Sequence, residues 1–189
     1  RRSSDLWDTK YHEARMLAVL LMDPKITTEV EADRLIRDVM SWDLCDHLCK
    51  NLFLKMKRRD TFITEWMQEP QLYKKRAAFV LIAASVIHDK KLENDRMDGY
   101  LELIMRYADD ERDHVKKAAS SALKEIGKKD FHYNEKALLL ANEWVEKGNK
   151  VQRWIGKDAL RELETMIKAE GRGRLITANT RMGKEIVRK

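Results

Sequence analysis

The chain has 189 residues, a formal net charge of +6, and 37% charged against 43% hydrophobic residues. A chain this long buries about two-thirds of its unfolded surface, which makes disulfides or a metal unnecessary for folding, and its apolar content is too high for a disordered chain. Only seven glycines and two prolines are present, which argues against a turn-rich sandwich or barrel and favours long helices.

Hydrophobic periodicity predicts nine helices and no strand, because no segment alternates with period two between turns. The breaks fall at Asp23 and Pro24, at Glu69 and Pro70, and at two glycines, 127 and 148. Ser41 and the pair Asp109 and Asp110 are the expected N-caps. In chain order, the predicted helices cover residues 10–22, 29–40, 42–57, 60–68, 71–88, 94–108, 111–127, 134–147 and 149–169.

Four helix starts resemble one another, each with a cation followed by small or apolar residues. The aligned cations are Arg15, Arg76, Lys117 and Arg153, separated by 61, 41 and 36 residues. A helix-pair period near 40 is typical of HEAT-type arrays, which stack their repeats and present a concave surface to a long ligand. We therefore expect an all-α fold of HEAT-like helical repeats stacked into a curved superhelix. The first helix resembles the second half of a repeat, so the chain either lacks N-terminal helices or begins with an irregular cap.

The charge is distributed unevenly along the chain. Residues 171–189 contribute +5 and leave +1 for residues 1–170. We expect a repeat domain over 1–170 and a basic, mobile tail over 171–189 that adds phosphate affinity sensitive to salt. No apolar run is long enough to span a membrane, no secretory signal opens the chain, and only two cysteines occur. We expect an intracellular protein, cytoplasmic and associated with the nucleoid if bacterial.

Cations gather at helix starts, where the macrodipole favours acids instead. Lys74, Lys75 and Arg76 precede the most apolar segment, residues 77–87, and Lys116, Lys117 and Arg153 repeat the arrangement. Free N–H groups at these ends attract phosphate, which would offset the unfavourable placement. The alternative is an internal ladder of ion pairs between repeats.

Trp42 and Asp46 are four residues apart on one predicted helix and share a face. An aromatic ring beside a carboxylate suits a cationic ligand, although Trp42 could equally be a core residue. Cys45 and Cys49 are read as small core residues, because no second cysteine pair completes a zinc site. Neither a metal nor a cofactor is expected. Trp154 follows Arg153 and could face the groove.

With these motifs in view, the chain resembles the DNA-alkylation-repair family of AlkD-like HEAT-repeat DNA glycosylases over residues 6–163. The resemblance rests on Leu6-Trp7, on Ser41 to Asp46, on Tyr73 to Ala78, and on Lys116 to Ala119. It implies a superhelix that holds duplex DNA and cleaves the N-glycosidic bond of cationic N3- or N7-alkylated purines. No general acid, metal or cofactor is implied.

The resemblance also implies roles for individual residues. Trp42 would pack on the deoxyribose, Asp46 would stabilise the oxocarbenium-like sugar and position water, and Arg76 would contact the backbone near the lesion. These three form the predicted catalytic set. The predicted DNA-binding set is Tyr73, Lys74, Lys75, Lys116, Lys117, Arg153, Trp154 and Lys157.

One departure from the family pattern is Ser121, which stands where a second cleft tryptophan is expected. The leading hypothesis is a monofunctional alkylpurine DNA glycosylase acting as a monomer on alkylated duplex DNA. The alternatives are a DNA-binding HEAT-repeat protein without excision activity, favoured by Ser121, and a protein-binding HEAT scaffold, favoured by the small charge of residues 1–170.

Overall fold

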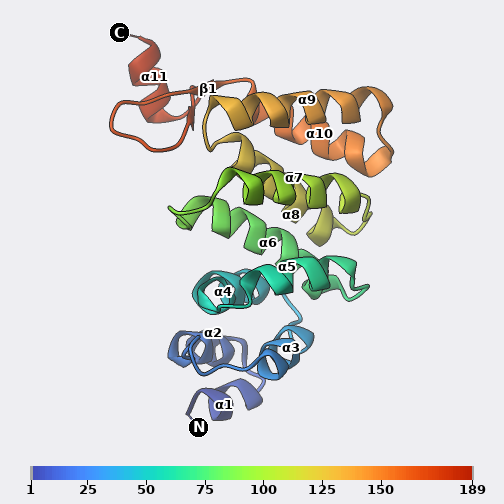
Figure 1. The fold of residues 1–189 in the computed structure, drawn as a ribbon. Helices are drawn as coiled ribbons and strands as arrows, with labels where there is room; N and C mark the ends of the chain where they lie inside the picture. The colour runs from blue at the N-terminus through green and yellow to red at the C-terminus, as the bar shows by residue number, and fades with distance from the viewer. Residues whose placement is uncertain (1, 189) are drawn as a thin grey trace. The chain divides into compact units, whose positions relative to one another are not determined.

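The computed structural model describes residues 2–188, and in this range the chain forms eleven α-helices, one 3-10 turn and one short hairpin (Figure 1). No helix in this range is long and apolar enough to cross a membrane. The elements are α1 (Arg2–Asp8), α2 (His12–Leu21), α3 (Glu29–Arg37), α4 (Trp42–Asn51), η1 (Phe53–Lys55), α5 (Arg59–Gln68), α6 (Leu72–His88), α7 (Asn94–Tyr107), α8 (Asp113–Gly127), α9 (Phe131–Lys147), α10 (Lys150–Leu163), β1 (Met166–Ile167), β2 (Ile176–Thr177) and α11 (Arg181–Val187).

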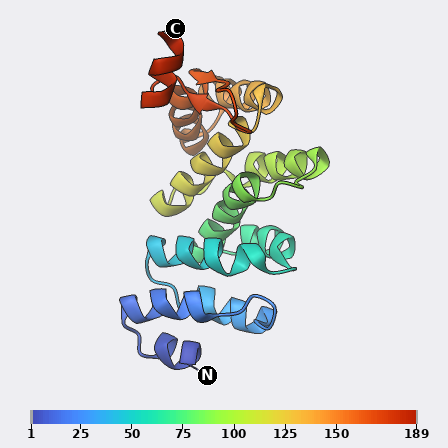
Figure 2. The same ribbon diagram turned by 90° about the vertical axis from the view of Figure 1, so that its left-hand side faces the viewer.

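Two compact units make up the chain, the first reaching to Ser85 and the second beginning at Val86. The boundary expected at residue 170 concerns another division, between the helical repeats and the C-terminal segment, and stays a prediction. In the first unit, α2 and α3 form one layer and α4 and α5 the next, as both views show (Figures 1 and 2). In the second unit, α10 packs along both α8 and α9.

The core of the first unit forms where α4 packs against α6. The thiols of Cys45 and Cys49 donate to the carbonyl oxygens of Tyr73 and Ala77 at 3.5 and 3.8 Å. Both cysteines are fully buried and unbridged, which confirms their reading as small core residues. Along α6, every side chain from residue 77 to 82 is buried, as its apolar sequence predicted.

The first helix, α1, was not predicted, because seven residues are too few to hold a helix by their own propensity. Tertiary contacts stabilise it. Trp7 is fully buried, its indole donates to Asp38 at 3.1 Å, and the guanidinium of Arg15 lies 4.9 Å from its ring centroid. Arg15 also donates to the carbonyl oxygens of Trp7 and Asp38. Arg15 therefore ties the end of α1 to the end of α3.

Helix ends differ from the predictions where side chains compete for the backbone. The helix predicted over 42–57 ends at Asn51 and continues as η1. Asp130 caps α9 by accepting from the N–H of Tyr133, so the helix starts at Phe131, three residues early. Asp110 accepts from the N–H and side chain of Arg112 and does not cap α8, whose N-cap position is Arg112. Ser41 holds the N-cap position of α4 without a side-chain cap bond.

The C-terminal segment contains the hairpin and α11, so the prediction of no strand was wrong. Helix α10 ends at Leu163, six residues early, because the chain turns into β1, which pairs antiparallel with β2. Arg174 lies within the basic segment and donates to the carbonyl oxygens of Val86 and Glu125 at 2.9 and 2.8 Å. Leu175 is buried beside it. The segment expected to be a mobile tail thus folds onto the second unit through residues 174–177.

Close helix packing in the second unit depends on one glycine. A Cβ atom on Gly156 of α10 would come within 2.6 Å of the carbonyl oxygen of Ala141 in α9. Gly99 in α7 differs, because a Cβ there would meet nothing within 4 Å. Both glycines lie within helices. Only at Gly156 do the backbones of two helices, α9 and α10, come so close that a side chain would not fit.

Candidate functional site

The centre of the predicted catalytic set is an ion pair between α4 and α6. The Nε and Nη2 atoms of Arg76 donate to the two carboxylate oxygens of Asp46 at 2.9 and 3.0 Å. The side chains are 10% and 19% exposed, respectively. A guanidinium fork on a carboxylate fixes both groups in one plane. The carboxylate therefore has one orientation and keeps a small exposed edge.

Trp42 lies beside this pair and faces solvent. It is the first residue of α4, its side chain is 53% exposed, and the Arg76 guanidinium lies 5.9 Å from its ring centroid. Large aromatic side chains are usually buried, so an indole half in solvent offers a stacking surface. The structure brings Trp42, Asp46 and Arg76 together. Spacing predicted that Trp42 and Asp46 share a face, and the catalytic role of the three stays a prediction.

Tyr73 lies beneath this group and supports it. Its hydroxyl donates to the carbonyl oxygen of Met40 at 3.2 Å, and the residue is buried. Burial raises the pKa of Tyr73. The hydroxyl ties the start of α6 to the loop before α4, so Tyr73 positions the site and presents no ring to a ligand. The DNA-contact role predicted for Tyr73 is corrected accordingly.

Lys74 does not reach a ligand either. It is 3% exposed, and its Nζ lies 2.6 Å from Asp33 and 3.6 Å from Glu69. This is the internal ion pairing that was the alternative for the helix-start cations. Lys74 is therefore removed from the DNA-binding set, because its side chain is buried and two carboxylates compensate its charge. Lys75, its neighbour, is half-buried.

A hollow of about 480 Å³ lies at the N-terminal end of α4. Three cations, one histidine and one acid line it: Lys10, Arg15, Arg37, His12 and Asp38. The imidazole of His12 is 3.0 Å from Asp43, in the same turn as Trp42. Lys10, His12 and Arg37 were not predicted as site residues, because Arg37 lies 25 residues after His12 and only the folded chain brings it beside them. The hollow adds positive charge next to Trp42.

In the second unit, the predicted residues lie on α8 and α10. The Nζ of Lys116 is 4.8 Å from the ring centroid of Trp154 and 2.9 Å from Asp113. Trp154 is 37% exposed. Lys117 and Lys157 are exposed. Because α8 and α10 pack together, these side chains give a basic face with one aromatic ring.

Arg153 is exposed, and its Nε donates to the carbonyl oxygen of Gly148 at 2.9 Å. This hydrogen bond gives the carbonyl oxygen of Gly148, just before α10, a donor. Among the described residues, no carboxylate forms an ion pair with Arg153. Ser121 is exposed on α8. The aromatic residue expected at this position is therefore replaced by a small polar side chain on an accessible surface.

A ladder of ion pairs continues from the Lys116–Trp154 contact along the same faces of α8 and α10, one and two turns further on. Asp158 accepts from Ser120 at 2.6 Å and from Lys124 at 2.9 Å. Burial raises the pKa of Asp158, but these hydrogen bonds outweigh it and leave the pKa below its ordinary value. The ladder continues through Glu162, Lys128 and Glu125 to Arg174. These charges stabilise the unit and are not available to a ligand.

No cluster of three or more metal-ligating side chains occurs within residues 2–188. The chemistry open to the site in the first unit is that of an oriented carboxylate, an accessible indole and nearby positive charge. Such a site can bind a sugar–phosphate backbone and stabilise positive charge that develops close to Asp46.

Comparison with known proteins agrees with the fold. A solved structure superposes with a TM-score of 0.67 at 17% identity, covering 98% of this chain and 73% of that one. It is described as "A new family of proteins related to the HEAT-like repeat DNA glycosylases with affinity for branched DNA structures". At this identity the likeness shows the fold, which is an all-α arrangement of HEAT-like repeats. No curated protein matches the chain.

The model of the DNA alkylation repair enzyme family matches residues 2–163. The match includes α1 to α10 and both groups of predicted site residues. The chain belongs to the DNA alkylation repair enzyme family.

Proposed function

We propose that the protein is a monofunctional DNA glycosylase that excises cationic N3- and N7-alkylated purines from duplex DNA. The observation that carries the proposal is the half-exposed indole of Trp42 beside a carboxylate, Asp46, held rigid by Arg76. Family membership supports a role in alkylation repair. The protein acts as a monomer, with alkylated duplex DNA as its substrate.

The chemistry needs little from the protein. An alkylated purine already carries positive charge, so the bond from C1′ to the base nitrogen breaks without protonation and the base leaves with the electron pair. Positive charge then develops on the sugar. A carboxylate fixed in a site of low water content stabilises that charge without reorganising. Water adds to C1′ and loses a proton to solvent.

In this proposal, Trp42 packs against the deoxyribose and Asp46 faces C1′. A carboxylate has about four lone-pair sites, and the two bonds from Arg76 leave others for a water molecule. The geometry supports a positioning role for Arg76, because two of its donors are used on Asp46. The backbone near the lesion is held by the cations of the hollow. In the second unit, Lys117, Arg153 and Lys157 are the proposed phosphate contacts.

The test is release of base from methylated duplex DNA by the purified protein. The expected result is free 7-methylguanine or 3-methyladenine, with an abasic site left in the strand. Release of neither base, under conditions where the protein binds the DNA, would contradict the proposal.

The second candidate is a DNA-binding protein without excision activity. The exposed Ser121 favours it, because the aromatic contact expected there is missing. A structural relative is described as having affinity for branched DNA structures, which this candidate would share. A Ser121→Trp variant separates the two candidates: activity gained from an inactive wild type would place the defect at this residue.

A further inference from the structure

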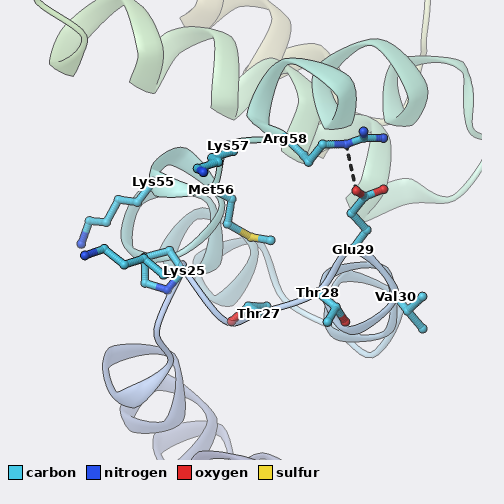
Figure 3. Close-up of a pocket in the computed structure, with 10 residues that line it drawn as sticks. Lys25, Thr27, Thr28, Glu29, Val30, Lys55, Met56, Lys57 and Arg58 are labelled. Carbon is cyan, nitrogen blue, oxygen red and sulfur yellow. Dashed lines mark ion pairs between the residues drawn. The ribbon is translucent and has the colours of Figure 1, made fainter.

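A second basic surface lies in the first unit, away from the site described above. A pocket of about 840 Å³ opens between the loop after α2 and the loop after η1. We call it the basic pocket (Figure 3). It is lined by Pro24, Lys25, Thr27, Thr28, Glu29, Val30, Lys55, Met56, Lys57 and Arg58.

The charge of this pocket is strongly positive. Four cations and one acid line it, which gives a formal charge of +3, whereas residues 1–170 together carry only +1. The acid, Glu29, is engaged by the Nε of Arg58 at 2.9 Å. Among the described residues, Lys25, Lys55 and Lys57 form no ion pair with a carboxylate. Three like charges therefore remain uncompensated around one opening.

The three lysines come from different parts of the chain and converge. Lys25 follows α2, while Lys55 and Lys57 follow α4 about 30 residues later. Figure 3 shows the side chains of Lys25 and Lys55 extending to the same side of the pocket. Exposed lysines in one place repel each other unless an anion lies between them, and a chain of phosphates is the anion that matches several cations in a row.

The basic pocket lies at the opposite end of α4 from Trp42. A ten-residue helix is about 15 Å long, and Lys55 and Lys57 lie beyond its last turn. The lining residues belong to loops, to η1 and to α3, with none from α2 or α4. The pocket thus opens at the edge of the repeats and away from the helix ends that carry His12 and Trp42.

We infer that the basic pocket binds the sugar–phosphate backbone of a second DNA segment, distinct from the duplex held beside Trp42 and Asp46. The inference rests on the proposed function only in requiring that the protein bind DNA; excision is not needed for it. Such a segment is present when a strand or duplex arm leaves the bound duplex, as at a branch point. Lys25, Lys55 and Lys57 contact its phosphates, and Met56 closes the floor of the pocket.

The experiment compares two DNAs of matched length and sequence, a linear duplex and a three-way junction. Binding of each is measured from 50 to 300 mM salt, about the range where phosphate contacts change affinity steeply. The variants are Lys25→Ala, Lys55→Ala and Lys57→Ala combined, and the same three positions changed to Arg. A matched control replaces three exposed lysines elsewhere, Lys90, Lys91 and Lys147, with Ala.

The expected result is a selective loss. On the junction, the salt slope of the triple Ala variant falls by about 2–3, close to 0.9 for each phosphate contact. On the linear duplex its binding stays at the wild-type level. The triple Arg variant and the control triple bind the junction like the wild type.

Other outcomes overturn the inference in different ways. Equal junction binding by wild type and triple Ala variant means that the pocket binds no DNA. An equal loss on both DNAs means that the pocket contacts the same duplex as Trp42. The same loss in the control triple means that only net charge matters. A wild type that binds neither DNA refutes the proposed function and this inference together.

Discussion

Asp46→Asn tests whether the carboxylate beside Trp42 acts on the sugar or only holds Arg76. Asparagine keeps the shape of the side chain and one acceptor oxygen, and it loses the charge and one of the two bonds to Arg76. If Asp46 stabilises charge that develops in the transition state, base release slows by roughly 10²–10³, the usual effect of losing one preorganised contact. Binding of undamaged DNA changes little, because cations make the proposed contacts to the phosphates and this acid makes none.

Stability also changes, by an amount that follows from the burial of the pair. A lost hydrogen bond to a charged group costs about 1.5–3 kcal/mol, and this pair is partly exposed. We expect the free energy of unfolding to fall by about 1–3 kcal/mol, which lowers Tm by roughly 2–12 °C in a chain of this size. Release must therefore be measured well below the Tm of the variant.

The assay is single-turnover release of 7-methylguanine or 3-methyladenine, with thermal melting measured alongside. Asp158→Asn is the matched control, because Asp158 is also a partly buried carboxylate that accepts two hydrogen bonds, from Ser120 at 2.6 Å and from Lys124 at 2.9 Å, outside the proposed site. It should lose stability and keep its release rate. Equal rates for an active wild type and Asp46→Asn would falsify the catalytic role.

Three further outcomes are expected. Lys117→Ala should reduce the slope of log affinity against log salt concentration for duplex binding by about one unit. An unchanged slope would mean that Lys117 of α8 does not contact the DNA. Gly156→Ala should destabilise by about 1–3 kcal/mol in chemical denaturation, because its Cβ would meet a backbone oxygen, whereas Gly99→Ala should stabilise by about 0.5–1 kcal/mol. Comparable effects at the two glycines would show that helix propensity alone decides. The lowered pKa of Asp158 adds stability that is present above about pH 4, the ordinary value of a free aspartate, and is lost as pH falls further. The stability difference between wild type and Asp158→Asn should therefore shrink in acid, and a difference that is constant with pH would contradict the pairing.

Local spacing predicted the parts of the site that lie on one helix. Trp42 and Asp46 share a face because four residues make about one turn, and the apolar run at 77–82 identified the buried helix that carries Arg76. The pairing of Arg76 with Asp46 joins residues 30 positions apart, and it was not predicted: the family resemblance implied only that Arg76 contacts the DNA backbone. Most helices were also predicted correctly, because the spacing of apolar residues along the sequence indicates which face of a helix is buried.

Long-range pairing explains what the sequence could not predict. Lys74 looked like a phosphate contact because its partner Asp33 lies 41 residues earlier, on another helix. Helix α1 depends on Trp7 meeting Asp38. The basic pocket could have been predicted from the repeat pattern. Loops that follow equivalent helices in successive repeats lie side by side, and this places Lys25 near Lys55.

The anchoring of Arg174 has a consequence for the order of folding. Its acceptors lie 88 and 49 residues earlier, at the end of α6 and in the last turn of α8. Contacts this far apart close large loops and form late. The binding place for Arg174 exists only after Val86 and Glu125 have come together, whereas α9 and α10 are neighbours in sequence and associate locally. During synthesis the helical repeats of this unit can therefore assemble first, and the hairpin and α11 join a surface that is already complete.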